Sequence, residues 1–172
     1  PTVFQSFKPF VSSHEQISDI VSDFKNLGSV LIVAPDERDV EKIVESLSST
    51  FNNVLKLSSA STREERYRNF LLSMRLDSSI VVGTRSAIFA PVRNPAAIII
   101  YKESSPDHYE LRAPGWNSSA IAKMRAESEG LALVLTGFTP SVRVAHEIDA
   151  RTIKFVNQRT QVNVQAFVPS DG

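Results

Sequence analysis

The chain has 172 residues, of which 42% are hydrophobic and 22% are charged, and its 19 basic residues balance its 19 acidic ones. This size and composition fit one globular domain, and no apolar run reaches the length that a membrane helix needs. The zero net charge is unlike that of a stand-alone nucleic-acid-binding domain, which usually carries a strong basic excess. Any contact with nucleic acid is therefore expected to be local and weak.

The residue inventory also limits metal and redox chemistry. The chain contains no cysteine, which excludes disulfides and thiolate metal sites. His14, His108 and His146 are scattered without ligand spacing, so we expect no metal site. The sequence starts with proline, and no signal-peptide pattern follows. We interpret residues 1–172 as one cytoplasmic lobe cut from a longer chain, without membrane contact.

Strands and helices are predicted to alternate from the amino end. Residues 2–5 can form a first strand, and a helix follows with Ser13 as its N-cap, Gln16 completing a capping box and Gly28 closing it. The later helices have their own caps at Asp36, Thr62 and Asn117, an end at Gly130, and a short last helix starting at Pro140. The apolar strands between them are predicted at residues 30–33, 53–57, 79–82, 96–100 and 131–135. The helix after Thr62 is expected to turn Tyr67, Phe70, Leu71 and Met74 into the core.

This alternation predicts an α/β fold, a three-layer α/β/α sandwich with a mainly parallel sheet. Residues 104–116 form a long loop with two prolines and several aromatics, and a loop of that length in a compact domain is usually functional. The alternating tail, residues 152–168, is expected to add one or two edge strands before a Pro-Ser-Asp-Gly linker, so that residues 152–172 close the lobe.

The stretch from Ser79 to Pro91 organises the chain, because it combines a buried strand with a Gly-Thr-Arg-Ser loop at the strand's carboxyl end. In open α/β sheets this edge is where ligands bind. Three other apolar strands end in short polar loops that should meet it at the same edge. These loops are residues 34–37, 101–104 and 136–141.

The order of these loops resembles the first RecA-like lobe of superfamily-two helicases, and more narrowly the PriA family of replication-restart helicases (primosomal protein N′). The most specific match is Ile80-Val81-Val82-Gly83-Thr84-Arg85-Ser86-Ala87-Ile88-Phe89-Ala90-Pro91. Residues 30–37 are similar to the family's Ia segment, Thr139-Pro140-Ser141 to the end of its third motif, and Arg125-Ala126 to a pair that the family shares. The resemblance runs from about Phe4 to Val144.

The family's ATPase residues are not present in this sequence. A Walker loop needs glycines around the phosphates, then Lys and Ser or Thr. The corresponding residues, 7–14, read Phe-Lys-Pro-Phe-Val-Ser-Ser-His. The family's Asp-Glu-Glu-His box, which holds Mg²⁺, is replaced by Tyr101-Lys102-Glu103-Ser104, and Gly137-Phe138 replace Ser-Ala in the third motif. We therefore expect no bound ATP or Mg²⁺ and no catalytic residues, and interpret the chain as a degenerate helicase lobe.

The resemblance implies that Thr84, Arg85 and Ser86 lie where the family's lobe touches the DNA backbone. A hydroxyl and a guanidinium at a strand end suit a phosphate. The alternative is that Arg85 pairs with a carboxylate and Thr84 caps a helical turn. In the long loop, His108, Tyr109, Arg112 and Trp116 occupy the place of the family's aromatic-rich loop. There Tyr109, Arg112 and Trp116 can contact unpaired bases, or the loop can pack on a neighbouring lobe.

Three functions are compatible with the sequence. The first is a non-catalytic PriA-type lobe that helps to assemble the replication-restart primosome. Its partners would be forked or single-stranded DNA, other domains of its own chain, primosome proteins and single-strand-binding protein. The second is an active ATP-dependent DNA helicase with an unusual nucleotide site. The third is a small-molecule-binding α/β domain unrelated to DNA.

Overall fold

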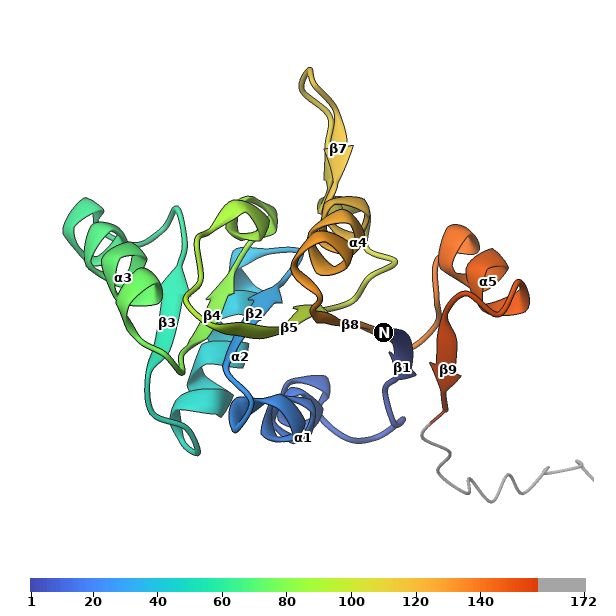
Figure 1. The fold of residues 1–172 in the computed structure, drawn as a ribbon, viewed down its shortest axis with the longest axis horizontal. Helices are drawn as coiled ribbons and strands as arrows, with labels where there is room; N and C mark the ends of the chain where they lie inside the picture. Colours follow the sequence, from blue (N-terminus) through green and yellow to red (C-terminus); the bar gives the residue numbers. More distant parts are fainter. Residues whose placement is uncertain (158–172) are drawn as a thin grey trace, which may run out of the picture.

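The structure, a computed structural model, describes residues 1–157, and its centre is a parallel sheet of seven strands (Figure 1). The strands stand in the order β3-β4-β2-β5-β8-β1-β9, and every neighbouring pair is parallel. Their bounds are Thr2–Ser6 (β1), Ser29–Val33 (β2), Val54–Leu57 (β3), Ile80–Gly83 (β4), Pro95–Ile100 (β5), Ala132–Gly137 (β8) and Lys154–Val156 (β9). Because all the strands run the same way, their carboxyl ends meet at one edge, as predicted.

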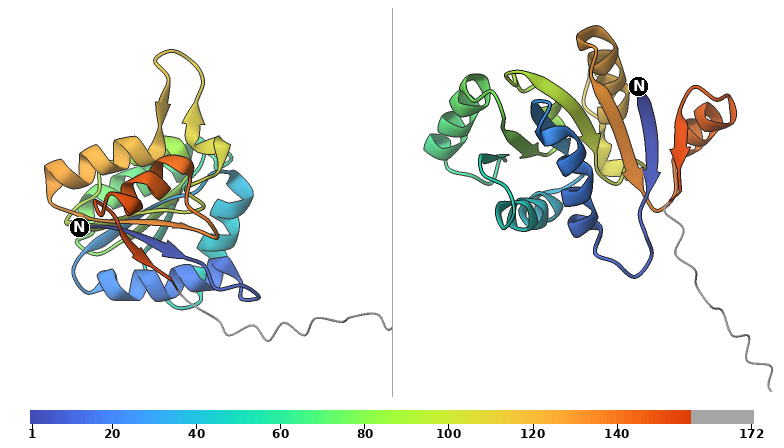
Figure 2. Two further views of the ribbon diagram at one scale, coloured as in Figure 1. Left: turned by 90° about the vertical axis from the view of Figure 1, so that its right-hand side faces the viewer. Right: turned by 60° about the horizontal axis from the view of Figure 1, so that its bottom comes forward.

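Helices cover both faces of this sheet, which confirms the predicted α/β/α sandwich (Figures 1 and 2). On one face lie α1 (Ser13–Lys25) and α2 (Glu37–Ser48). The other face packs against α3 (Arg63–Arg75), the short 3₁₀ helix η1 (Arg85–Phe89), α4 (Ser118–Glu129) and α5 (Val142–Asp149). The long loop contains a second 3₁₀ turn and a small antiparallel hairpin. These are η2 (Pro106–His108), β6 (Tyr109–Glu110) and β7 (Trp116–Asn117).

The core follows the alternation of the central strands. Leu31 and Val33 of β2 point into the apolar cluster beneath η1 and α4, whereas Val30 and Ile32 point into the cluster beneath α1 and α2. All four side chains are at most 1% exposed. A strand that is covered on both faces needs such a continuous apolar run, and this is why β2 was recognisable in the sequence.

Three predictions about α1 are wrong. Ser13 is the first helical residue of α1, and the N-cap is Ser12. The Ser13 hydroxyl makes no cap and hydrogen-bonds the Tyr101 hydroxyl at 2.6 Å instead. Gln16 forms no capping box, since its side chain binds the backbone of Lys8 and Val11 and fixes the preceding loop. The helix also ends at Lys25 and not at Gly28. A Cβ added at Gly28 would lie 2.4 Å from the Asn94 carbonyl oxygen, so only glycine fits where the chain passes Asn94.

The prediction of which face of α3 is buried is also wrong. Tyr67, Phe70 and Met74 point to solvent, with exposed fractions of 65%, 39% and 37%. The helix packs instead through Leu72, which contacts the core, and through Asn69 and Ser73, which hydrogen-bond the carbonyls of Lys56 and Pro91 respectively at 2.9 Å. Polar side chains anchor this helix by hydrogen bonds, so its apolar periodicity marks the outer face.

The remaining predicted caps agree with the structure except at α5. Asp36, Thr62 and Asn117 each accept a backbone N–H at their helix starts, and Gly130 adopts the left-handed conformation with φ of 70°. The last helix is capped by Ser141 rather than begun by Pro140. At the tail, β9 confirms one edge strand, beside β1. The other predictions for the tail fall on residues 158–172, outside the described part.

Candidate nucleic-acid interface

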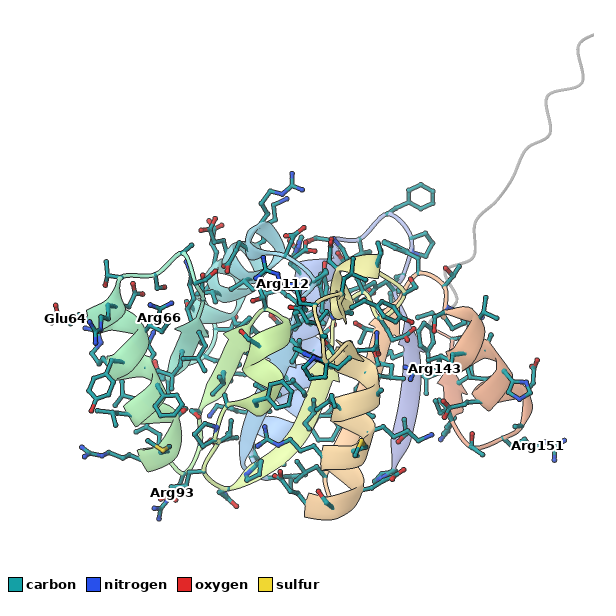
Figure 3. The ribbon with its side chains drawn as sticks, turned by 90° about the horizontal axis from the view of Figure 1, so that it is seen from above. Glu64, Arg66, Arg93, Arg112, Arg143 and Arg151 are labelled. Carbon is teal, nitrogen blue, oxygen red and sulfur yellow. The ribbon has the colours of Figure 1, made fainter. Side chains whose placement is uncertain are left out.

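A groove of about 420 Å³ lies at the carboxyl edge of β2 and β4. Thr84, Arg85 and Ser86 line it from the β4 loop, Glu110 and Trp116 from the hairpin, and Asp36 from the start of α2. The structure thus brings four of the six predicted site residues together. Tyr109 and Arg112 do not line the groove. Tyr109 is 53% exposed, and Figure 3 shows Arg112 above the middle of the sheet.

Gly83 sets the path of the chain at the end of β4. A Cβ at this position would lie 2.4 Å from the Leu57 carbonyl oxygen and 2.6 Å from the Ala87 Cβ. Only glycine therefore permits the strand to stay paired with β3 while η1 folds back tightly over it. The turn is closed by the Ala87 N–H, which donates to the Thr84 carbonyl at 2.8 Å. Thr84 and Arg85 are consequently presented at the groove.

Arg125 holds the other end of η1. Its guanidinium donates to the carbonyls of Ile88 and Ala90 at 2.9 Å each, and to the Glu129 carboxylate at 2.7 Å. The Arg125-Ala126 pair noted in the sequence thus has a structural role, since it ties α4 to the segment that leaves the groove. Ala126 is 5% exposed and packs in the same apolar cluster.

Arg85 is paired within the lobe. Its guanidinium donates to the Asp107 carbonyl at 3.0 Å and to the Glu110 carboxylate at 3.2 Å. The Arg112 N–H also donates to Glu110, at 3.0 Å, and this bond, reinforced by Arg85, holds the pKa of Glu110 below its usual value. Thr84 precedes η1, but its side chain forms no capping hydrogen bond. The structure therefore shows the predicted alternative for Arg85, which pairs with a carboxylate, but not the predicted cap by Thr84. No spacing pattern in the sequence indicates Glu110 as the partner of Arg85.

The base of the hairpin is fixed by a buried histidine. His108 is fully buried, and its Nε2 donates to the Tyr101 carbonyl at 2.8 Å. Burial lowers the pKa of His108, so the ring is neutral at pH 7. At the hairpin's far strand, Trp116 packs edge-on against Phe89, with ring centroids 5.0 Å apart. Trp116 is thus oriented by η1, at the wall of the groove.

Residues 7–14 and 101–104, which correspond by resemblance to the nucleotide-binding motifs of a RecA-like lobe, pack their aromatic side chains together. Phe7 is only 4% exposed and packs against the rings of Tyr101 and Phe138, each at 5.5 Å. Tyr101 is buried, and burial raises the pKa of its hydroxyl to about 12, so it remains a protonated partner of Ser13. Without glycines in the loop before α1, the backbone cannot wrap a phosphate. These residues do not fit ATP.

Residues 101–104, which correspond to the family's Mg²⁺-binding box, also make internal contacts. The Lys102 ammonium donates to both oxygens of Asp39 at 2.9 Å, and His14 lies 3.3 Å from the same carboxylate. Glu103 is 4% exposed and accepts the backbone N–H and the hydroxyl of Ser141 at 3.1 and 2.9 Å. An ammonium group beside one such carboxylate is the wrong donor set for Mg²⁺. Residues 1–157 also contain no cluster of His, Cys, Asp or Glu that could bind a metal.

No family model matches the chain, whereas individual proteins do. The "Probable replication restart protein PriA" of Mycobacterium tuberculosis is 30% identical over 112 residues, which are 64% of this chain and 17% of that protein. The PriA of Synechocystis is 30% identical over 122 residues, 70% of this chain and 15% of the relative. The PriA of Thermotoga maritima is 24% identical over 157 residues, 88% of this chain and 21% of the relative. The chain spans about a sixth to a fifth of the length of these relatives.

Solved structures agree on the fold. The C-terminal domain of S. cerevisiae Dbp5, solved with Gle1 and IP6, has a TM-score of 0.64 at 12% identity, covering 91% of this chain and 89% of the other. The E. coli DExH-box NTPase HrpB has a TM-score of 0.56 at 13% identity, covering 85% of this chain and 20% of the other. None of the helices in residues 1–157 is long and apolar enough to cross a membrane. The chain therefore has the fold of a RecA-like helicase domain and is related in sequence to the PriA replication restart proteins.

Proposed function

We propose that this chain is a non-catalytic lobe of a PriA-type protein, which holds forked or single-stranded DNA during replication restart in the bacterial cytoplasm. The observation that carries the proposal is the groove of Thr84, Arg85, Ser86 and Trp116 on a lobe whose nucleotide position is filled by Phe7 and Tyr101. A guanidinium and hydroxyls suit phosphates, and an indole suits an unpaired base.

The proposal requires Arg85 to exchange its partner. In the structure the guanidinium faces Glu110, and 36% of the side chain is exposed, so a phosphate can reach it from the groove. Exposed ion pairs contribute only about 0–1 kcal/mol, so a phosphate can replace this carboxylate at small cost. Asp36 and Glu37 also line the groove, and they should keep its affinity for DNA low. Other domains of the parent chain, primosome proteins and single-strand-binding protein are the proposed partners that complete the assembly.

The test is fluorescence anisotropy of labelled forked DNA with the wild type, Arg85→Ala and the control Arg151→Ala. Arg151 is an exposed arginine on the α5–β9 loop, far from the groove (Figure 3). We expect weak, salt-sensitive binding that Arg85→Ala reduces about fivefold or more and that the control leaves within twofold. Equal binding by all three proteins would contradict the proposal.

Two other functions make different predictions. An active helicase with an unusual nucleotide site requires Mg-ATP to raise the melting temperature, because a ligand that binds only the folded state stabilises it. A small-molecule-binding domain is supported by the groove volume, which lies in the usual range for such ligands. That function would leave the lobe without measurable affinity for forked DNA at low salt.

A further inference from the structure

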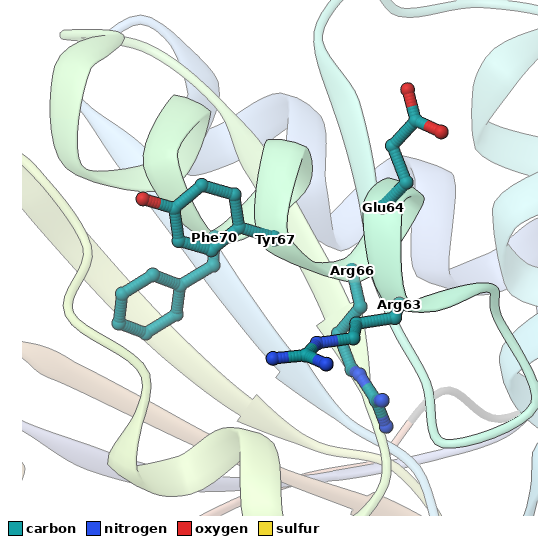
Figure 4. Close-up of a pocket in the computed structure, with 5 residues that line it drawn as sticks. All are labelled: Arg63, Glu64, Arg66, Tyr67 and Phe70. Atoms are coloured by element: carbon teal, nitrogen blue, oxygen red, sulfur yellow. The ribbon is translucent and has the colours of Figure 1, made fainter.

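The outer face of α3 carries a continuous stripe of exposed arginine and aromatic side chains. Arg63, Arg66, Tyr67, Phe70 and Met74 recur at helical spacing, so they share one side of the helix. Figure 4 shows the two guanidinium groups extended to one side, the Tyr67 and Phe70 rings projecting together, and the Glu64 carboxylate pointing away. Tyr67, Phe70 and Met74 are exposed although they are apolar or aromatic, and such gathered apolar side chains are typical of interaction surfaces.

The stripe also carries two cations that have no partner within the described residues. Within residues 1–157, the guanidinium groups of Arg63 and Arg66 make no hydrogen bond or ion pair. Arg85 in the neighbouring groove, by contrast, is held by Glu110 and Asp107. Free guanidinium groups beside exposed aromatic rings are the combination that binds the phosphates and bases of single strands. Charge therefore favours a polyanionic partner on α3.

The stripe is continuous with the candidate groove. A second hollow, of about 310 Å³, lies between α3 and η1. This second hollow shares Ser59 and Ser86 with the groove. It shares Arg66 and Phe70 with a further hollow on the outer face of α3, which Arg63, Glu64 and Tyr67 also line. Phe89, which is 60% exposed, stands on the wall of the second hollow and contacts Trp116. One extended ligand can thus run from Trp116 past Phe89 to Tyr67 without leaving the hollowed surface.

We propose that single-stranded DNA extends from the Thr84–Arg85–Ser86 groove onto α3, where Arg63 and Arg66 contact its phosphates and Tyr67 and Phe70 stack on its bases. This inference rests on the proposed function of the groove and adds a second contact site to it. It assigns a role to Tyr67 and Phe70, which sequence periodicity alone places in the core. Binding on α3 requires a longer strand than binding in the groove.

The test uses fluorescently labelled thymidine oligonucleotides of about 5 and about 15 nucleotides, the ends of the range seen for single-strand sites. The variants are Tyr67→Ala and the double variant Arg63→Gln/Arg66→Gln. The matched controls are Phe10→Ala, which removes another exposed ring, and Arg68→Gln/Arg75→Gln, which removes two charges from a neighbouring face of α3. All are exposed positions, and a thermal melt verifies that each variant is folded.

We expect Tyr67→Ala to weaken binding of the long oligonucleotide about fivefold or more, and the arginine pair to lower the salt slope by about 0.7 per lost phosphate contact. The controls should stay within twofold, and the short oligonucleotide should bind all proteins alike. Trp116, the single tryptophan of the chain, reports separately on the groove. At saturation the long oligonucleotide should still quench its fluorescence in Tyr67→Ala.

Two results would overturn the inference. If the long oligonucleotide binds and quenches Trp116 equally in the wild type and both α3 variants, α3 is outside the DNA path and the groove proposal survives. If neither oligonucleotide binds the wild type at low salt, the groove proposal and the α3 extension both fail.

Discussion

The Arg85 guanidinium lies 3.2 Å from the Glu110 carboxylate, so the cation at the end of β4 is tied to the hairpin that follows β5. The same hairpin carries Trp116 and rests on the buried His108. Under the proposed function, Glu110 therefore occupies the position beside Arg85 that a DNA phosphate would take. The pair joins the two halves of the candidate groove and competes with its proposed ligand.

Replacing Glu110 with Gln should strengthen DNA binding. The variant removes the negative charge beside Arg85 while its amide oxygen can still accept a hydrogen bond, and we expect a severalfold gain in affinity for labelled single-stranded DNA at low salt. Glu127→Gln is the control, because Glu127 is exposed on α4 and its loss changes the net charge equally. An equal gain in both variants would show that net charge, and not release of Arg85, causes the effect.

Replacing Lys102 with Met should destabilise the lobe. Asp39 has only 8% of its side chain exposed and accepts both hydrogen bonds of Lys102, so the variant leaves a nearly buried carboxylate with His14 alone. We expect the free energy of unfolding in urea to fall by about 2 kcal/mol. Lys42→Met, an exposed position on α2, should change it by less than about 0.5 kcal/mol. Similar changes in the free energy of unfolding for both variants would show that the Lys102–Asp39 ion pair does not stabilise the lobe.

Gly83→Ala should disturb both stability and the groove. The added methyl group meets the Leu57 carbonyl oxygen at 2.4 Å, so β3 or η1 must move, at a cost of about 1–3 kcal/mol. The movement should displace Arg85 and weaken DNA binding. At Gly115 the nearest atom is 3.3 Å away, so Gly115→Ala should cost less. Unfolding of both variants in urea compares the two positions, and an unchanged Gly83→Ala protein would contradict the packing at the end of β4.

His108 should make stability fall in mild acid. Its pKa is lowered from 6.5, first by burial, and Arg85 adds to this, whereas the Tyr101 carbonyl and the carboxylates of Glu103 and Asp107 oppose it. Below about pH 6.5 the unfolded chain binds a proton that the folded chain does not, so the free energy of unfolding decreases as pH falls. Melting temperatures at about pH 7.5 and about pH 5.5 should differ less in His108→Gln than in the wild type. His146→Gln, at an exposed position, should retain the full difference in melting temperature between the two pH values. If His108→Gln shows the same difference as the wild type, His108 is not the cause.

Part of this structure follows from the sequence and part does not. Continuous apolar runs such as Val30 to Val33 require burial on both faces, so the strands and their parallel orientation were predictable. The gathering of Thr84, Arg85 and Ser86 at a sheet edge followed from the topology alone. The face of α3 was not predictable, because Asn69 and Ser73 anchor it by hydrogen bonds that periodicity does not register. The Arg85–Glu110 pair depends on the fold of the hairpin, and nothing in the spacing of the two residues indicates it.

We propose that this lobe holds DNA without using a nucleotide. The most direct test of this proposal is the affinity of the wild-type chain for labelled forked DNA across a series of salt concentrations, each with and without Mg-ATP. We expect the logarithm of the affinity to fall linearly with the logarithm of the salt concentration, and the series with and without Mg-ATP to coincide. A separation of the series by Mg-ATP would contradict the account, because it would require a working nucleotide site where Phe7 and Tyr101 now pack. So would the absence of binding at the lowest salt.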